Sequence, residues 1–266
     1  MQQNSGLSIR LILMVAVIGF SVLKYYFTTS VNPVTGEKQH VSLTAEQEIQ
    51  MGLQSAPEMA AQMGGELNNP KVVSAIQAIG SKLVSLTEAK KSPYVFNFHV
   101  LADPETINAF ALPGGQIFIT VGLLKHLTKE DQIAGVLGHE MGHVINRHSA
   151  EQMEKQHEMS GIVNGVMMGA SGSNSGMASA QIAQYAAQML NLKYSRNDEL
   201  EADKYGLHYM NDSGYNPTEM LTVMKILEDV SGNKGKNDFQ STHPSPENRM
   251  AKIKEELTKM GITSSN

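Results

Sequence analysis

The sequence predicts an α+β fold that is mainly helical, with a small β-sheet flanking one central helix. Apolar residues recur at helical spacing through residues 44–86, 128–156 and 195–260, which indicates amphipathic helices. Alternating, β-branched and aromatic side chains gather in residues 94–120, which is enough for a few short strands. A chain of 266 residues can bury a sizeable core in one or at most two domains.

Charge and cysteine content limit what the chain can bind. The formal net charge is −5 and no basic stripe occurs, so nucleic acid is not an expected partner. The chain contains no cysteine, which excludes disulfides and thiolate ligands. Any bound metal ion must therefore be held by histidine, aspartate or glutamate.

An apolar run, Leu11–Leu23, lies between Arg10 and Lys24 near the start of the sequence. As a helix it spans about 20 Å, which suits the core of a signal peptide and is shorter than the ~30 Å hydrocarbon layer. No Ala-x-Ala-like cleavage site follows, and Lys24 with the next aromatic residues can extend the span to the membrane interface. We favour an uncleaved signal anchor at residues 1–30 over a cleaved signal peptide; a buried core helix is the least favoured alternative.

Two scaffold helices are predicted next. Residues 31–43 are expected to form an extended linker with a turn. Thr44 and Gln47 match a capping box, which begins a helix that runs to about Met63. Pro70 suits the first turn of a second helix, because its fixed φ angle and missing N–H are tolerated there.

Residues 94–101 alternate in polarity as a strand does. A hairpin is predicted where residues 107–112 meet Pro113-Gly114-Gly115 and continue into residues 116–120. His99 has apolar neighbours and is expected to be a structural histidine rather than a ligand. Near a catalytic cleft such a strand can bind an extended peptide by strand addition, but an ordinary internal strand fits the pattern equally well.

The stretch Gly138-His139-Glu140-Met141-Gly142-His143 lies in the middle of a predicted buried helix. Residues four apart share one helix face, so His139 and His143 can hold one metal ion. Glu140 lies about 100° around the helix, where it can reach a water molecule on that ion. Two histidine ligands of zinc with a glutamate as general base are typical of a metallopeptidase, and a chance match on a charged helix is the alternative.

The helix that carries this motif is predicted to begin with a capping pattern at Thr128 and Asp131 and to continue to about Gln156. On one continuous helix, His148 lies about 140° around from His143. It therefore cannot join the same face, and a further ligand must come from another helix.

A helix that begins at Ser195 supplies that ligand. Helical spacing puts Glu199 and Asp203 on its inward face, whereas Glu201 points towards solvent. Buried carboxylates need partners, and a metal ion with its imidazoles supplies them. Glu199 is the predicted third ligand, and Asp203 is predicted to accept the free N–H of a ligating histidine. A helix salt-bridged to basic residues elsewhere is the alternative.

His243 is followed by Pro244 and, after one serine, by Pro246, which is predicted to start the last helix. Taken alone, His243 is more typical of a surface histidine. Arg249, a few residues further on, is equally compatible with a surface ion pair.

Three motifs occur together in this chain: His139-Glu140-x-x-His143, Glu199-x-x-x-Asp203 and Asn108-Ala109-Phe110-Ala111-x-Pro113-Gly114-Gly115. Over roughly residues 32–256 the combination resembles the gluzincin-type metallopeptidase family of the CAAX prenyl endopeptidase, HtpX, OMA and BepA. The resemblance implies a zinc endopeptidase with one Zn²⁺ per chain, Glu140 as catalytic base, and His139, His143 and Glu199 as ligands. It also implies that substrate binds along residues 108–120; the predicted substrate-binding residues are Asn108, Ala109, Phe110, Gly114 and Gly115.

The resemblance also gives the C-terminal residues a role. It implies that His243 lies near the metal, as a fourth ligand in a closed resting state or as a contact to the reacting carbonyl. It implies that Arg249 is a cationic partner of the oxyanion. The chain is similar to the short, exported bacterial members of the family, so a prenyl-protein substrate is not expected.

The expected activity is hydrolysis of peptide bonds in misfolded or misassembled envelope proteins. The rival hypothesis is a latent or chaperone-like protein-binding module with a closed zinc site. The expected location is the inner membrane, contacted through the N-terminal segment, with a periplasmic catalytic domain; a cleaved signal would instead leave a soluble periplasmic protein.

The predicted organisation follows from these assignments. A signal anchor or signal peptide covers residues 1–30 and a linker covers residues 31–43. The zinc metallopeptidase domain covers residues 44–260, and residues 261–266 form a tail. Within the domain, residues 160–180 are rich in Gly, Ser and Met, and are predicted to be a loop or lid rather than a second membrane span.

Overall fold

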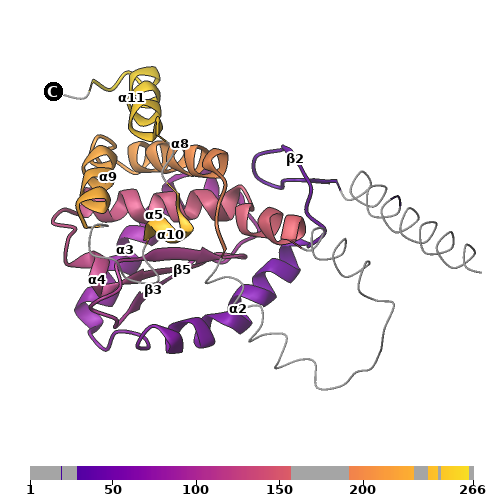
Figure 1. Ribbon diagram of the computed structural model, residues 1–266, viewed down its shortest axis with the longest axis horizontal. Coiled ribbons are helices and arrows are strands. Elements are labelled where there is room, and N and C mark those ends of the chain that lie inside the picture. Colours follow the sequence, from indigo (N-terminus) through magenta and orange to yellow (C-terminus); the bar gives the residue numbers. More distant parts are fainter. Residues whose placement is uncertain (1–18, 20–28, 157–191, 231–238, 245–246, 264–266) are drawn as a thin grey trace, which may run out of the picture.

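The computed structural model describes residues 19, 29–156, 192–230, 239–244 and 247–263. The elements in chain order are β1 (Ser30–Val31), β2 (Lys38–Gln39), α2 (Ala45–Gln62), α3 (Pro70–Leu86), the 3-10 helix η1 (Glu88–Lys91), β3 (Asn97–Leu101), β4 (Ala109–Leu112), β5 (Gln116–Thr120), α4 (Val121–Leu124), α5 (Glu130–Ile145), α8 (Arg196–Asp212), α9 (Glu219–Val230), α10 (Phe239–Thr242) and α11 (Arg249–Lys259). Helix α5 lies between the small sheet and α8 (Figure 1). The predicted α+β, mainly helical fold with a sheet beside the central helix is confirmed.

The three-stranded sheet has the order β3-β5-β4, with β3 parallel and β4 antiparallel to the central β5. Strands β4 and β5 form the predicted hairpin, in which Phe110 pairs with Phe118. At its turn, Gly114 and Gly115 have φ angles of +80° and +107°, which side chains other than glycine rarely adopt. A Cβ on Gly114 would lie 2.4 Å from the Cα of Ile49, so glycine also lets α2 pack closely against this turn.

The predicted helix starts before and after the sheet are confirmed. The Thr44 hydroxyl accepts a hydrogen bond from the Gln47 backbone N–H at 3.3 Å, and the Gln47 side chain accepts one from the Thr44 N–H at 2.9 Å. Ser195 forms the same reciprocal box at the start of α8. Helix α3 begins at Pro70, with Asn69 as its cap.

The helix with the histidine motif differs from the prediction at both ends. Lys129 precedes α5 without a side-chain cap, since its ammonium group only donates hydrogen bonds, and Asp131 accepts the backbone N–H of Asn216 at 2.7 Å. The helix ends at Ile145 rather than near residue 156, and Arg147 adopts a φ of 59°. Helical residues resume at His148. A continuous helix was therefore the wrong expectation for this stretch.

The N-terminal strands β1 and β2 pack on this break. The Asn32 amide donates to the Ile145 carbonyl at 2.8 Å, and the Gln39 amide donates to the Asn146 carbonyl. These side chains satisfy carbonyls that the end of α5 leaves without helical partners. Within the predicted linker at residues 31–43, the chain thus forms a two-stranded ribbon that caps the metal-motif helix.

Several expectations fall outside the described residues. They concern the apolar segment near the N-terminus, apart from Gly19, and the Gly/Ser/Met-rich stretch at residues 160–180. Among the residues that the structure does describe, no helix is long and apolar enough to cross a membrane. The last helix begins at Arg249, after the N-cap Asn248, and not at Pro246 as predicted.

Helices α5 and α8 approach closely because small residues line their contact. A Cβ on Gly138 would lie 3.3 Å from the Cα of Gly206. A Cβ on Gly142 would lie 2.8 Å from the Ala202 carbonyl oxygen and 2.9 Å from its Cα. This close crossing brings the carboxylates of α8 over the histidines of α5.

Candidate metal centre

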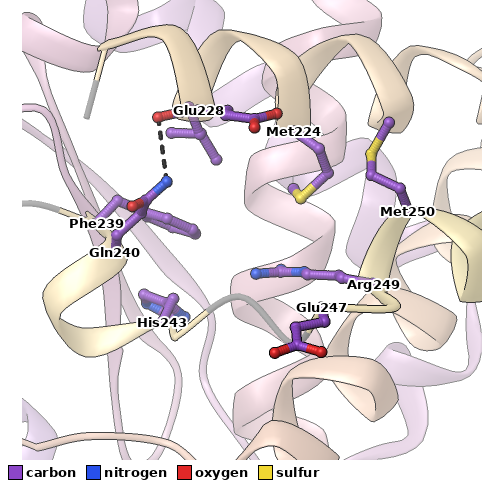
Figure 2. Close-up of a pocket in the computed structure, with 9 residues that line it drawn as sticks. Met224, Glu228, Phe239, Gln240, His243, Glu247, Arg249 and Met250 are labelled. Atoms are coloured by element: carbon purple, nitrogen blue, oxygen red, sulfur yellow. Dashed lines mark hydrogen bonds between the residues drawn. The ribbon is translucent and has the colours of Figure 1, made fainter. Parts of the chain in front are cut away.

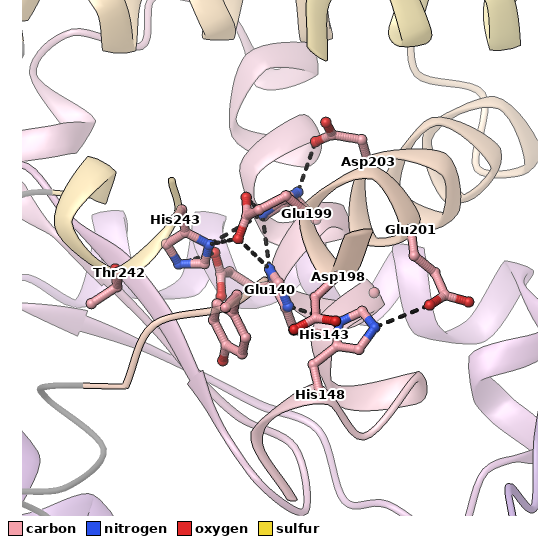
Figure 3. Close-up of polar contacts among 12 residues, drawn as sticks. Glu140, His143, His148, Asp198, Glu199, Glu201, Asp203, Thr242 and His243 are labelled. Carbon is pink, nitrogen blue, oxygen red and sulfur yellow. Dashed lines mark hydrogen bonds and ion pairs between the residues drawn. The ribbon is translucent and has the colours of Figure 1, made fainter. Parts of the chain in front are cut away.

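Four buried side chains meet where α5, α8 and the end of α10 come together (Figure 3). His139, His143, Glu199 and His243 each offer one ligand atom, and these atoms lie within 4.8 Å of one another. The Nε2 atoms of His139 and His143 are 3.1 Å apart, and each lies 3.5 Å from an oxygen of Glu199. The predicted ligands of the two helices are thus in one place.

The donor set fits a zinc ion. The two Nε2 atoms face each other in the interior, and at most one of them can donate a proton to the other. A bound cation would accept lone pairs from these two nitrogens and from the Glu199 carboxylate. Two imidazoles and a carboxylate are ligands that zinc takes in catalytic sites, and no thiolate is required.

The carboxylate of Glu199 is held ionised by its neighbours. Burial alone would raise its pKa, but His243 and hydrogen bonds from the histidines of the cluster hold the pKa well below the usual glutamate value. Nδ1 of His243 lies 3.0 Å from Glu199 Oε1, and Arg249 Nη1 lies 2.9 Å from Oε2. An ionised carboxylate is the form that binds a metal ion.

Asp203 lies one turn beyond Glu199 and orients His139. The His139 Nδ1–H donates to Asp203 Oδ1 at 2.9 Å, so Nε2 faces the cluster. Arg249 donates two hydrogen bonds to the same carboxylate, at 2.7 and 2.8 Å. Burial would raise the pKa of Asp203, but Arg249 and His139 outweigh it and lower that pKa.

Arg249 is therefore surrounded by acidic partners. It is buried, and its guanidinium contacts both Asp203 and Glu199. Burial would lower its pKa, yet the two carboxylates raise it above the usual arginine value. The structure brings Arg249 to the cluster; its role beside an oxyanion stays a prediction.

Glu140, the glutamate between the two motif histidines, differs from the other carboxylates of the cluster in its hydrogen bonding. It is fully buried, and neither of its oxygens has a hydrogen-bond partner among the described residues. Nε2 of His243, which also lacks a partner there, is 3.6 Å from Glu140 Oε1. Burial raises the pKa of Glu140, and His243 and His139 act against that rise. Free lone pairs next to the donor set are what a general base requires.

Aromatic rings fix the imidazoles from two sides. Phe239 of α10 stacks on His243, with ring centroids 4.1 Å apart and an interplanar angle of 10°. Tyr194, just before α8, stacks on His143 at 3.8 Å and 19°. His243 is 1% exposed, so it is not the surface histidine that its local sequence suggests.

Two residues near His143 were not predicted to belong to the site. His148 Nδ1 lies 2.9 Å from His143 Nδ1, and His148 Nε2 lies 3.2 Å from Glu201 Oε2. The helix break at Arg147 returns His148 to the face that a continuous helix denies it. Glu201, which was expected to point towards solvent, has a side chain that is 36% exposed and in addition pairs with His148. A polar Asn-Arg-His triplet inside an otherwise buried segment was the available signal.

The predicted substrate-binding residues lie in and beside β4, at one edge of the sheet. Asn108, Ala109 and Phe110 are all less than one-tenth exposed, and Phe110 stacks on Phe118 with centroids 4.8 Å apart. Gly114 lies at the turn, against α2. The adjacent Gly115 lies against the backbone before β3. Their contact with substrate stays a prediction.

A cavity of about 390 Å³ opens beside the cluster (Figure 2). His243 and Phe239 lie on one side of it, and Arg249 and Met250 lie on the other. The remaining lining residues are Met224, Leu227, Glu228, Gln240 and Glu247.

The fold and the donor set together define the metal centre of an HExxH-type metallopeptidase. Comparison with known proteins agrees: the model of peptidase family M48 matches residues 70–257, and the chain belongs to that family. The suspected gluzincin-type family is thereby confirmed. Peptidases of this family use zinc, in agreement with the four-residue cluster.

Curated relatives extend the match beyond the catalytic helices. The β-barrel assembly-enhancing protease of Escherichia coli is 28% identical over 237 residues, which cover 86% of this chain and 47% of that protein. The mitochondrial metalloendopeptidase OMA1 of Schizosaccharomyces pombe is 31% identical over 238 residues, which cover 88% of this chain and 68% of that protein. OMA1 of Arabidopsis thaliana is 34% identical over 154 residues, which cover 54% of this chain and 28% of that protein. The chain spans about half the length of the β-barrel assembly-enhancing proteases that it matches.

Proposed function

We propose that the protein is a zinc-dependent endopeptidase that hydrolyses peptide bonds of proteins. One observation carries the proposal: Glu140, whose carboxylate has no hydrogen-bond partner among the described residues, belongs to the same motif as the converging ligands His139 and His143 and lies 3.6 Å from His243 of the cluster. A purely structural zinc site has no use for a free buried carboxylate, which costs free energy unless it has a task. A chaperone-like module is disfavoured for the same reason.

The residues divide the chemistry between them. His139, His143 and Glu199 would hold a zinc ion, which would supply Lewis acidity and lower the pKa of a bound water molecule. Glu140 is the group that would take a proton from the attacking water molecule and pass it to the leaving amine. His243 reaches towards Glu140 and is the candidate donor to the developing oxyanion, while Arg249 keeps Asp203 and Glu199 ionised and is the second candidate.

His243 also supports a closed resting state of the same enzyme. Its Nδ1 lies 3.0 Å from Glu199 and 3.4 Å from His139 Nε2, which is within the donor set itself. As a fourth ligand it would fill the position that catalytic zinc leaves open for water. Activation then requires the α10 segment to move. A His243→Ala variant that binds zinc and cleaves an unstructured protein faster than wild type supports this state; slower cleavage favours the oxyanion role.

The cavity beside His243 is the proposed pocket for a substrate side chain next to the scissile bond. Met224 and Met250 give it adaptable apolar walls, and Phe239 adds an aromatic face. Such a pocket favours a bulky apolar side chain. Substitution of Met224 by tryptophan should shift cleavage towards small side chains in a degenerate peptide library, whereas an unchanged preference would exclude the pocket.

For the location we propose an exported protein that the N-terminal segment anchors in the inner membrane, with the peptidase domain in the periplasm. The apolar run at residues 11–23 supports this location. The proposed substrates are misassembled envelope proteins, which the β-barrel assembly in the name of the Escherichia coli relative supports. N-terminal sequencing of membrane and soluble fractions separates an anchor from a cleaved leader. Proteins captured by a Glu140→Gln trap would identify the substrates.

The activity itself is tested with Glu140→Gln, which removes the base and retains the ligands. Cleavage of casein should fall by about 10²–10⁴-fold while zinc content is unchanged. Glu151→Gln is a matched control, because Glu151 lies on the helical segment after α5 and pairs with the solvent-facing Lys155. Equal casein cleavage by Glu140→Gln and wild type would sink the catalytic assignment.

A further inference from the structure

A line of polar contacts leads from the metal cluster to the surface through His143. His143 Nδ1 lies 2.9 Å from His148 Nδ1, and His148 Nε2 lies 3.2 Å from Glu201 Oε2 (Figure 3). Both imidazoles are buried, at 1% and 2% exposure, whereas the Glu201 side chain is 36% exposed. The line therefore starts at a ligand and ends on a carboxylate that water can reach.

The position of each proton along this line follows from hydrogen bonding alone. His143 Nε2 faces His139 and Glu199, so its lone pair belongs to the donor set and its proton sits on Nδ1. That N–H donates to His148 Nδ1, which must then accept. His148 consequently carries its own proton on Nε2 and donates it to Glu201. Other arrangements of two neutral rings leave a buried nitrogen without a partner.

We propose that His148 and Glu201 are positioning residues for His143. They fix its tautomer and ring orientation, as Asp203 does for His139. Both ligand histidines are thus oriented from α8: His139 directly by a carboxylate, and His143 through an intervening imidazole. The inference rests on the zinc site of the proposed function.

The line of contacts from His143 through His148 to Glu201, called the relay below, depends on a break in the helix. Arg147 holds a φ of 59°, and its guanidinium is fixed by Glu48 at 3.0 Å and by the Leu43 carbonyl at 2.6 Å. The turn brings His148 back over His143. Tyr194 stacks on His143 and contacts Ser149 at 2.9 Å, so the ring is clamped beside the relay.

The competing interpretation is a tether, in which His148 only ties the segment after α5 to α8 through Glu201. Two substitutions separate the interpretations. His148→Leu removes the acceptor from His143, and His148→Asn keeps an oxygen close to the position of Nδ1 but does not reach Glu201. If His148 positions His143, the asparagine variant should retain part of the Zn²⁺ affinity that the leucine variant loses. If His148 is only a tether, the two variants should lose Zn²⁺ affinity equally.

The experiment measures Zn²⁺ affinity of the full chain by chelator competition, together with the absorption spectrum of the Co²⁺-loaded protein. His148→Leu should bind Zn²⁺ about 10–100-fold more weakly than wild type, with an altered Co²⁺ spectrum. The Zn²⁺ affinity of His148→Asn should lie between those of His148→Leu and wild type. Glu201→Ala should lose less affinity than His148→Leu, because water can replace its carboxylate. His208→Leu is the matched control, since His208 of α8 forms a similar histidine–glutamate pair with Glu256 of α11 at 3.0 Å, away from the cluster.

The outcomes separate this inference from the proposed function. His148→Leu with wild-type Zn²⁺ affinity overturns the positioning role, as does equal weakening of the leucine and asparagine variants. A wild-type chain that binds no Zn²⁺ overturns both proposals. A wild-type chain that binds Zn²⁺ tightly but cleaves no protein overturns the peptidase only, while the graded affinities still support the relay.

Discussion

The imidazole of His139 on α5 donates its Nδ1–H to the carboxylate of Asp203 on α8 across 2.9 Å. Arg249, the first residue of α11, binds the same carboxylate through two nitrogens. Three helices therefore meet at one buried acid, and the acid determines which nitrogen of His139 faces the cluster. This contact ties the packing of the C-terminal helix to the geometry of the metal ligands.

Replacing Asp203 by asparagine should weaken zinc binding by about 10–100-fold. The amide no longer provides an anionic acceptor for His139, and it leaves Arg249 with one carboxylate fewer in the interior. Chelator competition measures the effect. Asp212→Asn, at the exposed end of the same helix, should bind zinc as wild type does. Wild-type affinity in Asp203→Asn would mean that the contact does not orient the ligand.

The close crossing of α5 and α8 predicts that Gly142→Ala is destabilising. The new Cβ would lie 2.8 Å from the backbone oxygen of Ala202, so the helices must separate, at a cost of about 1–3 kcal/mol. Zinc affinity should fall as well, because Glu199 moves away from the histidines. Thermal unfolding with and without zinc measures both effects.

The control for this substitution is Gly135→Ala on the same helix. Its Cβ would meet the flexible side chains of Met210, at 3.5 Å, and Met220, at 3.7 Å, which are ordinary contacts. Alanine also has the higher helix propensity, by up to about 1 kcal/mol, so Gly135→Ala should be neutral or stabilising. A Gly142→Ala protein as stable as the Gly135→Ala protein would refute the packing argument.

Local rules predicted much of the fold and half of the site. The capping box at Thr44, the Pro113–Gly115 turn and the i, i+4 spacing of His139 and His143 depend on residues close together in sequence, and the structure agrees at each. Glu199 and Asp203 followed from helical periodicity on α8. Periodicity says which face a residue occupies, and a buried face with two carboxylates indicates a cation.

The missed features depend on residues far apart in sequence. Helix α5 ends early because Arg147 forms its ion pair with Glu48, 99 residues away, and because β1 and β2 cap the helix end. No pattern within residues 128–156 encodes those partners. The position of His148 follows from that break, so an argument from a continuous helix excluded it. The burial of His243 under Phe239 likewise requires the tertiary structure.

The ion pair of Arg147 and Glu48 yields a prediction about stability. Burial raises the pKa of Glu48 and the positive charge of Arg147 opposes that rise, so the two groups depend on each other. Arg147→Met leaves a buried carboxylate without its cation and should lower the free energy of unfolding by about 3–5 kcal/mol. Adding Glu48→Gln should recover part of this loss. Denaturant unfolding of the single and double variants measures the coupling.

The pair of the exposed Lys155 with the half-buried Glu151, 3.9 Å apart, is the matched control. Lys155→Met should change the free energy of unfolding by less than about 1 kcal/mol, because surface pairs contribute little. If Arg147→Met and Lys155→Met have similar effects, the break after α5 does not depend on the buried pair.

The pH dependence of cleavage should report the burial of Glu140. Burial raises its pKa above the usual glutamate value of 4.5, although His243 and His139 oppose the rise. Glu140 must be ionised to accept a proton, so kcat/KM should fall as the pH falls through that raised pKa. The acid limb should therefore lie above pH 4.5. Ligand histidines also take up protons in acid, so the zinc content must be measured at each pH. The zinc content of Glu140→Gln against pH shows the loss of metal without the titration of Glu140. An acid limb at or below pH 4.5 in protein that retains its zinc would show that Glu140 is not the group that limits the reaction.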